Sequence, residues 1–307
     1  MPDFILTDDN YYSREADIWY MSCSQFQQFE KCEAAALAKL RGIWEPDETP
    51  DALLQGQYFH SAMESEEAFA RFCEENREKI YKTKTVTDKA TKLKLEVVTG
   101  KYAPFERLDE MLNVTREDPQ IKRILSWPGE NEKFMTGNIG GIPWRMKMDK
   151  YAVGRRIIDY KTTANIWETY YDQQTKQRVS FIEEYGYMMR AAVYGEIERQ
   201  NTGADTLPSF MIIAISKQDP PDKDIFLLND DDRWLFELEK VKAKLPRIQR
   251  LKEGAENPRR CGMCEYCRST KKIKRVKQYT DLMPEFRNDP DNVEYDDYEG
   301  TSVFDTL

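Results

Sequence analysis

Two aspartates and a lysine, Asp149, Asp159 and Lys161, lie in a stretch whose alternating apolar and polar residues predict a β-hairpin over residues 139–163. If the hairpin turns at Gly154, residues at equal distances from that glycine face each other, so the two aspartates become cross-strand partners. Such partners have Cβ atoms about 4.5–5.5 Å apart. Two carboxylates this close repel each other unless a cation neutralises them. The pattern therefore predicts that Asp149 and Asp159 bind one divalent metal ion.

Lys161 follows Asp159 by two residues and therefore extends from the same face of the strand. An ammonium group beside a metal-bound phosphate can orient or help deprotonate an attacking water, and it offsets negative charge in the transition state. Tyr160 lies between them, and its backbone carbonyl is a further candidate metal ligand. The alternative is an ordinary Asp–Lys ion pair on a solvated strand, because a bare D-x-K pattern is common.

The chain contains a single histidine, His60. Glu64 follows it by four residues, and residues at this spacing share a helix face. An imidazole and a carboxylate placed in this way are candidate ligands for the same ion. The alternative is that His60 is a packed or half-exposed residue beside the apolar Phe59 and Met63.

Three of the six cysteines, Cys261, Cys264 and Cys267, are separated from one another by two residues. This spacing is poor for separate disulfides, but it lets three thiolates converge on one metal centre. A fourth ligand is absent from the neighbouring sequence and must come from another part of the chain.

The pattern along the rest of the chain alternates between expected helices and strands. Helices are expected at residues 24–41 (with Ser24 as the N-cap and Gly42 after the end), 52–77, 104–126 (interrupted at Pro119), 181–200 and 231–253. A buried strand is expected at residues 209–216, and an exposed hairpin or basic arm at residues 82–101. These elements predict an α/β fold in which a mixed central sheet contains the hairpin of residues 144–162.

The composition is that of a folded globular protein, since 40% of its 307 residues are apolar and 12% are aromatic. No stretch approaches the apolar length of a membrane span, and the first residues lack the pattern of a signal peptide. We therefore expect a cytoplasmic protein that does not bind membranes.

The net charge of −9 does not exclude a nucleic-acid partner, because DNA senses the local field of a surface. Residues 82–101 contain six lysines, and residues 259–277 contain eight lysines or arginines. The excess of acidic residues is concentrated in residues 280–307, which we expect to form a flexible tail. The two basic segments are candidates for contacts with the DNA backbone; the alternative is that they are solvated loops.

Together, these motifs resemble the PD-(D/E)xK nuclease superfamily, and specifically its RecB-like branch. There, a G-x-x-x-H helix, an aspartate on one strand and a D/E-x-K on the next strand meet at one or two Mg²⁺ or Mn²⁺ ions. The matching residues, in the same order, are Gly56, His60, Asp149, Asp159 and Lys161. Within this branch, the chain resembles the RecE-type exonucleases of phages and prophages of Gram-positive bacteria. The resembling segments are residues 24–40, 136–141, 159–163, 199–203 and 260–268, within residues 20–272.

The resemblance implies an exonuclease that depends on Mg²⁺ or Mn²⁺ and digests linear double-stranded DNA from 5′ to 3′. The remaining 3′ single strand would pass to a RecT-like annealing protein for recombination, in the cytoplasm of a bacterial cell. It also implies that the protein is encoded by a phage or prophage. The oligomeric state, including a homo-oligomer, does not follow from the sequence.

One position departs from the pattern of the family, which has a Q-x-x-x-Y motif on the helix after the active site. Arg190 stands in place of the glutamine, and Tyr187, Arg190 and Tyr194 share a helix face. A guanidinium can bind a phosphate where an amide cannot. These three residues are therefore candidates for substrate contact, and the polarity of digestion follows less directly from the resemblance than the chemistry does.

For the cysteine motif, the resemblance implies that the fourth ligand lies before the core, since iron–sulfur nucleases of the RecB branch take one cysteine from there. Cys32 is the corresponding residue. Cys23 and Cys73 are the alternatives, although isolated cysteines are commonly buried apolar side chains. A structural [4Fe–4S] cluster is expected; a structural Zn²⁺ is the alternative, because both use four cysteines.

The resulting expectation is an α/β, restriction-endonuclease-like core with a C-terminal cysteine lobe that binds metal. Its parts are an N-terminal segment (1–23), a nuclease domain (24–279) that includes the lobe (255–279), and the acidic tail (280–307). Two other functions stay open: a non-catalytic DNA-binding or scaffold protein with a nuclease fold, and a metal-cluster module that acts through protein contacts. The intact D…D-x-K set argues against the first.

Overall fold

The computed structural model describes residues 4–46, 51–87, 93–172, 175–273, 278–283 and 302–306. Its α-helices are α1 (Arg14–Trp19), α2 (Cys23–Lys31), α3 (Glu33–Leu40), α4 (Asp51–Glu64), α5 (Glu66–Glu75), α6 (Arg77–Ile80), α7 (Ala103–Glu117), α8 (Pro119–Leu125), α9 (Phe181–Glu184), α10 (Tyr187–Thr202), α11 (Asp231–Glu253) and α12 (Glu265–Ser269). Its strands are β1 (Tyr81–Thr87), β2 (Lys94–Lys101), β3 (Gly129–Ile139), β4 (Ile142–Ala152), β5 (Arg156–Thr163), β6 (Thr169–Asp172), β7 (Gln177–Ser180), β8 (Ser209–Ser216) and β9 (Lys223–Leu227). Short 3-10 helices follow at Tyr279–Leu282 and Val303–Thr306.

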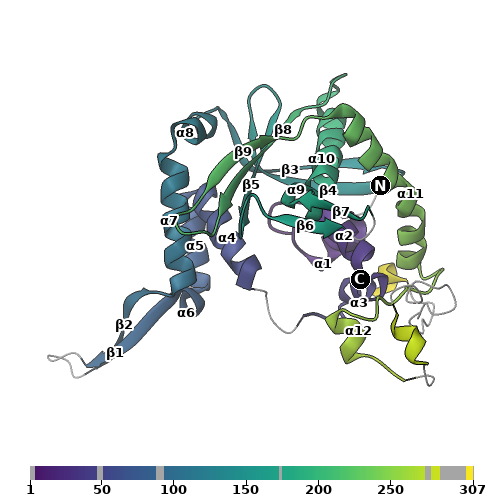
Figure 1. The fold of residues 1–307 in the computed structure, drawn as a ribbon, viewed down its shortest axis with the longest axis horizontal. Coiled ribbons are helices and arrows are strands. Elements are labelled where there is room, and N and C mark those ends of the chain that lie inside the picture. The colour runs from purple at the N-terminus through teal and green to yellow at the C-terminus, as the bar shows by residue number, and fades with distance from the viewer. Residues whose placement is uncertain are drawn as a thin grey trace.

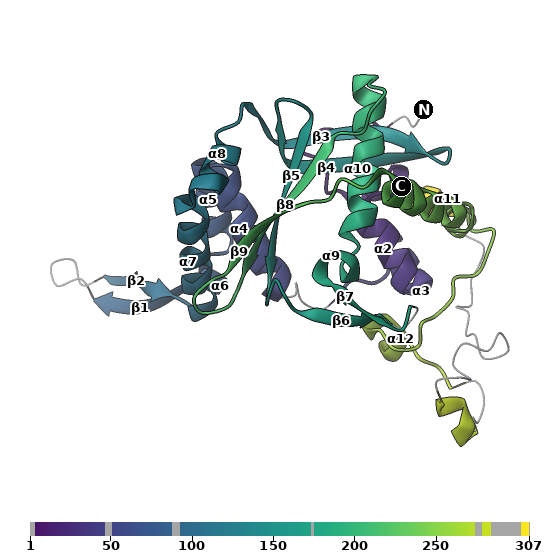
Figure 2. The same ribbon diagram turned by 45° about the horizontal axis from the view of Figure 1, so that its top comes forward.

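A five-stranded sheet with the order β3-β4-β5-β8-β9 forms the centre of the protein. Strands β5 and β8 are parallel, and the other neighbours are antiparallel, which confirms the expected mixed sheet. The β1–β2 hairpin projects away from the body of the protein, and its strands are largely exposed, as expected for the basic segment (Figure 2). Within the described residues, no helix is long and apolar enough to cross a membrane.

Helices cover both faces of the sheet, because successive residues of its buried strands point to opposite faces (Figure 1). Ile157 packs with the helices α2, α10 and α11, whereas its neighbour Ile158 packs with α4, α7 and α8. On β8, Ile212 and Ile213 divide in the same way. The sheet is therefore buried on both faces, and the segments that enter it are correspondingly apolar.

The helix expected at residues 24–41 is interrupted, and this part of the prediction is wrong. Ser22, not Ser24, caps the first helix, with its side chain accepting from the amide of Gln25. Cys32 is extended, with φ −164° and ψ 105°, and it separates α2 from α3. The amide of Ala34 donates to the carbonyl of Arg259, so the break connects this region to the cysteine lobe.

Two other expected helices are also divided. Ser65 interrupts residues 52–77 and caps α5 through a hydrogen bond to the amide of Ala68. Gly186, at φ +67°, separates α9 from α10. The sequence analysis also did not predict most of β3, whose mixed polar and apolar residues lack a regular alternation. The predicted tail at residues 280–307 lies for the most part outside the described residues.

The β4–β5 hairpin turns at Gly154, as predicted, and its register pairs Lys150 with Ile158 and Ala152 with Arg156. The ladder ends at the first of these pairs, immediately before the two aspartates. Farther along β4, Trp144 forms a parallel bridge with Met21 from the N-terminal segment. The two strands thus separate where the candidate site begins.

The predicted alternation along β4 also changes at this point. Met148 packs toward α10, as expected, whereas the Nζ of Lys150 donates to the carbonyl of Leu125 on the opposite face. Tyr151 donates to Glu198 of α10, so it lies on the same face as Met148, whereas a regular alternation would place it on the opposite face. The irregular β3–β4 pairing at Asp149 explains this change, because a local break in a ladder shifts which side chains point to each face.

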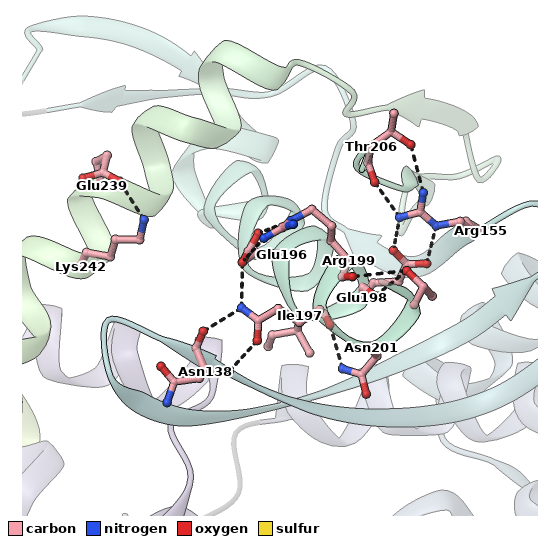
Figure 3. A network of polar contacts seen from close by, with 12 residues as sticks. Asn138, Arg155, Glu196, Ile197, Glu198, Arg199, Asn201, Thr206, Glu239 and Lys242 are labelled. Carbon is pink, nitrogen blue, oxygen red and sulfur yellow. Dashed lines mark hydrogen bonds and ion pairs between the residues drawn. The ribbon is translucent and has the colours of Figure 1, made fainter. Parts of the chain in front are cut away.

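The C-terminal half of α10 is fixed to the hairpins by buried polar contacts (Figure 3). Glu198, which is fully buried, accepts hydrogen bonds from Arg155 and Tyr151. Arg155 also donates to Thr206, and its own φ of +55° places it in the turn after Gly154. Since a buried carboxylate is costly without partners, this network fixes the turn relative to the helix.

Glu198→Ala is expected to lower the free energy of unfolding by about 3 kcal/mol, because it leaves Arg155 and Tyr151 without their buried acceptor. Urea denaturation measures this loss. The control is Glu239→Ala, since Glu239 forms an exposed ion pair with Lys242 on α11, and such pairs contribute about 0–1 kcal/mol. Equal losses in the two variants would contradict the role of the buried network.

Candidate active site

Asp149 lies at the point where β4 and β5 separate, and contacts from two other elements hold its carboxylate. One oxygen, Oδ2, accepts a 2.6 Å hydrogen bond from the backbone amide of Tyr160 on β5. The other, Oδ1, is 3.3 Å from Nδ1 of His60 on α4. The neighbouring strand thus reaches Asp149 through the amide of Tyr160 and not through Asp159, its predicted cross-strand partner, because the ladder ends one residue earlier. The lone histidine also contacts this aspartate.

The His60–Asp149 pair shifts the pKa of both groups. Burial alone would lower the pKa of His60, but the charge and hydrogen bond of Asp149 outweigh it, and the pKa of His60 is raised above its ordinary value. Burial alone would raise the pKa of Asp149, but the imidazole, Lys161 and the Tyr160 amide hold it well below its ordinary value. Asp149 is thus an ionised carboxylate at neutral pH.

Asp159 is almost completely buried, with 1% of its surface exposed, and two cations neutralise it. The Nζ of Lys161 lies 2.5 Å from Oδ2, and Nη1 of Arg190 lies 3.7 Å from Oδ1. Lys161 also donates to the carbonyl of Tyr160 at 3.0 Å, which is the carbonyl predicted as a metal ligand. The D-x-K motif is therefore buried, whereas the alternative interpretation placed it on a solvated strand.

The three residues of α10 expected to share a face do so beside Asp159. The guanidinium of Arg190 lies 5.9 Å from the ring centres of both Tyr187 and Tyr194. Lys161 is also 5.5 Å from the Tyr187 ring. Tyr194 is buried and donates to the backbone carbonyl of Lys147, so its contacts hold β4 against α10.

Asp149, Lys161, Arg190 and Tyr194 line a cavity of about 830 Å³. Helix α4 contributes Gly56, His60 and Glu64 to its wall. Around Gly56 there is open space where a side chain would otherwise project. Glu64 also lines the cavity, and its backbone carbonyl accepts a hydrogen bond from the side chain of Asn131.

The cavity also contains residues that the sequence analysis missed. Glu132 on β3 and Lys147 on β4 are 3.4 Å apart, and Tyr12 forms part of the rim. Burial and the nearby charge of Asp149 raise the pKa of Glu132 to about 7. Lys147 stands two residues before Asp149, a spacing that would have indicated it, whereas no sequence signal points to Glu132 because β3 itself was not predicted.

The donors around Asp149 fit a hard divalent cation, because carboxylate oxygens, a carbonyl and an imidazole are its usual ligands. These donor atoms lie farther apart than the ligand atoms of a compact metal site. Within the described residues, only the four cysteines place three or more ligand atoms all within 4.8 Å of one another. His60, Lys161 and Arg190 instead engage the two aspartates.

The cysteine cluster brings Cys32 together with Cys261, Cys264 and Cys267, so the fourth residue is the one that the resemblance implied. It lies where α12 packs against α3, and it joins the two ends of the domain (Figure 1). Cys23 packs in the core beside α10, and Cys73 packs with α4 and α7. Neither alternative belongs to the cluster.

The spacing of the sulfur atoms bears on the metal. The Sγ of Cys267 lies 3.6 Å from that of Cys32 and 3.9 Å from that of Cys261. Four sulfurs bound tetrahedrally to one Zn²⁺ at about 2.3 Å are about 3.8 Å apart. In a four-iron cluster each thiolate binds a different iron, so the sulfurs must be farther apart. The two distances from Cys267 are close to the spacing expected around one tetrahedral ion.

Comparisons with known proteins identify the family of the chain. Residues 22–270 match the family model described as a PDDEXK-like domain of unknown function, DUF3799. A solved structure, described as a "Putative exonuclease" from Eubacterium rectale, is 31% identical with a TM-score of 0.78, and the match covers 92% of this chain and 99% of that one. The structure of SSO0001 is 13% identical with a TM-score of 0.29, too low to bear on the fold. No curated protein gave a significant match.

The family model covers most of the chain, including the separated strands, the α4 and α10 residues and the cysteine lobe. The mixed sheet and flanking helices are those expected from the resemblance to PD-(D/E)xK nucleases. The chain belongs to the PDDEXK-like domain family DUF3799, within the PD-(D/E)xK superfamily.

Proposed function

We propose that the protein is a metal-dependent deoxyribonuclease that hydrolyses phosphodiester bonds of linear double-stranded DNA. The observation that carries this proposal is the D-x-K motif, in which the buried Asp159 pairs with Lys161, and Lys161 lines one cavity together with Asp149 and His60. An ordinary surface ion pair would not need this burial. The membership of a PDDEXK-like family supports the same chemistry.

In this proposal Asp149 and Asp159 hold the metal, and His60 and the Tyr160 carbonyl complete its shell. Glu64, one helical turn from His60, is an additional candidate ligand. Bound Mg²⁺ or Mn²⁺ would polarise the phosphate and lower the pKa of the attacking water.

Besides neutralising Asp159, Lys161 and Arg190 have a second role in the proposed reaction. Both cations now share the single buried carboxylate of Asp159. Once that carboxylate serves as a metal ligand, the two side chains are free to contact the adjacent phosphate. Lys161 would then orient the attacking water, and Arg190 would bind a phosphate oxygen through its planar donors. The metal would then balance the charge of Asp159, and the phosphate would balance the charges of Lys161 and Arg190, in a site where little solvent screens charges.

The finer features of the proposal come from the resemblance to RecE-type enzymes and from the name of the Eubacterium rectale relative. They are 5′ to 3′ exonuclease polarity, a 3′ single-stranded product, a RecT-like annealing partner, and a phage or prophage protein acting in bacterial cytoplasm. The exposed lysines of β1 and β2 and the basic residues after Arg259 are proposed contacts for the DNA backbone. Such contacts make binding weaker at high salt.

Asp159→Asn is expected to abolish Mg²⁺-dependent degradation of linear duplex DNA, because the amide keeps the shape but loses the charge that holds the metal. The assay uses duplexes labelled at either the 5′ or the 3′ end, with covalently closed circles as a second substrate. Wild-type protein should release the 5′ label first and leave the circles intact.

The control for that variant is Glu130→Gln, which changes an exposed carboxylate on β3 paired with Lys133. It should leave the rate unchanged. Degradation by Asp159→Asn at the wild-type rate would overturn the site assignment, and no degradation by the wild type would overturn the nuclease proposal. Release of the 3′ label first, or cutting of circles, would refute only the polarity or the exonuclease mode.

Arg190→Gln is expected to lower kcat/KM about tenfold, mainly through KM, and to reduce the salt slope of DNA binding by about one. The reason is that an amide lacks the charge that binds a phosphate oxygen. Single-turnover rates and fluorescence anisotropy at several salt concentrations measure the two effects. A fall in kcat with an unchanged salt slope would show instead that Arg190 only positions Asp159.

The cysteine cluster is proposed to be a structural metal site, and the sulfur spacing favours the Zn²⁺ alternative over [4Fe–4S]. Protein purified without oxygen should contain zinc and lack visible absorption. Cys32→Ser should lose the metal and melt at a lower temperature, because the metal joins the ends of the domain. Cys73→Ser, the control, should retain it. Iron with acid-labile sulfide and a visible charge-transfer band would establish the four-iron cluster instead.

A further inference from the structure

Glu132 has a backbone conformation that is unusual for its position. It lies inside the long strand β3, yet its φ is +51°, in the left-handed region that favours glycine. A side chain in this region clashes with its own backbone, so such residues persist only where the surrounding structure holds them. Strain of this kind gathers at functional sites, and the position of the side chain indicates which function to consider.

The strained residue is directly opposite Asp149. On either side of it, Asn131 pairs with Lys150 and Lys133 pairs with Met148, so the register brings Glu132 to the level of Asp149. The side chain of Asn131 donates to the carbonyl of Glu64 at 2.9 Å. This bond fixes the irregular part of β3 to the end of α4, the helix that carries His60.

The carboxylate of Glu132 is 22% exposed and lines the cavity of the candidate active site. It forms an ion pair with Lys147, whose Nζ lies 3.4 Å from the Glu132 carboxylate and 3.6 Å from that of Asp8. A structural ion pair is therefore one explanation for this residue. It is insufficient, because a partly exposed and shared ion pair contributes little, and a glycine would adopt the left-handed conformation without steric strain.

We propose that Glu132 binds the divalent cation together with Asp149, by supplying a carboxylate oxygen from the β3 side of the cavity. Two carboxylates held opposite each other on neighbouring strands destabilise the sheet unless a cation lies between them. The D…D-x-K motif places ligands on β4 and β5 only, so Glu132 adds a third strand to the metal site. The inference rests on the proposed function, since it concerns the same ion.

The test measures Mn²⁺ binding to the full-length protein without DNA, from the loss of the free Mn²⁺ signal in electron paramagnetic resonance. Glu132→Gln and Glu132→Gly should each weaken Mn²⁺ binding by about tenfold or more. Without added Mn²⁺, the glycine variant should also melt at a higher temperature than the wild type, because it removes the left-handed strain. Weaker metal binding together with higher stability is a combination that a purely structural glutamate would not produce.

The matched control is Glu130→Gln, two residues earlier on the same strand, which removes the same charge from an exposed position. It should bind Mn²⁺ as the wild type does. The inference is overturned if both Glu132 variants bind Mn²⁺ within twofold of the wild type, or if the control loses as much affinity.

Failure of the wider proposal gives a different result. If the wild type neither binds Mn²⁺ nor degrades DNA, the nuclease assignment and the inference fall together. If the wild type does both and the Glu132 variants bind Mn²⁺ normally, only the inference fails. Loss of Mn²⁺ binding in Glu132→Gln with an unchanged melting temperature supports it even where the glycine variant is not more stable.

Discussion

The separation of β4 and β5 is the constraint on which the rest of the site depends. A regular hairpin would continue its ladder past Lys150 and Ile158, and would leave Asp149 and Asp159 as a repelling pair with no space between them. The carboxylate of Asp149 instead accepts the amide hydrogen of Tyr160, in place of a carbonyl on the neighbouring strand. The backbone amide of Tyr160 thus has its hydrogen-bond acceptor in a side chain and not in a backbone carbonyl. That exchange opens the sheet and places Asp149 in the wall of the cavity, whereas Asp159 stays buried beside Lys161 and Arg190.

Burial then determines the charges that must surround these acids. Asp159 is almost inaccessible to water, so the energetic cost of its charge is met by Lys161 and Arg190 and not by solvent. Both cations are stacked near aromatic rings of α10, which limits their movement. In the proposed reaction, such a site would hold its positive groups in place for a phosphate before any substrate arrives. Preorganised charge of this kind is the largest single source of rate enhancement in many enzymes.

Helices, strands and turns that are specified by neighbouring residues could be predicted from local sequence patterns. Features that depend on contacts between residues far apart in the sequence could not. The turn at Gly154, the buried strand β8 and the long helix α11 follow from glycine, apolar runs and periodicity, and the structure has all three. The break between α2 and α3 at Cys32 could not be predicted in the same way, because the sequence around it favours a continuous helix. The helix is interrupted where the sulfur of Cys32 meets cysteines more than two hundred positions later in the chain. Glu132 was missed for a related reason: its strand is defined by pairing with β4, not by its own alternation.

The cysteine lobe and the cavity of the candidate active site are connected through the same short segment of chain. Helix α2 ends at Cys32 and begins shortly after Met21. The backbone of Met21 forms a bridge with Trp144 on β4, and its carbonyl accepts a hydrogen bond from the amide of Arg145. Met21 thereby occupies the place beside β4 that β5 has left. A metal that fixes Cys32 to the C-terminal lobe also fixes α2, and with it the segment that keeps β4 and β5 apart. A structural metal site remote from the cavity would thus contribute to the geometry of the two aspartates without touching them.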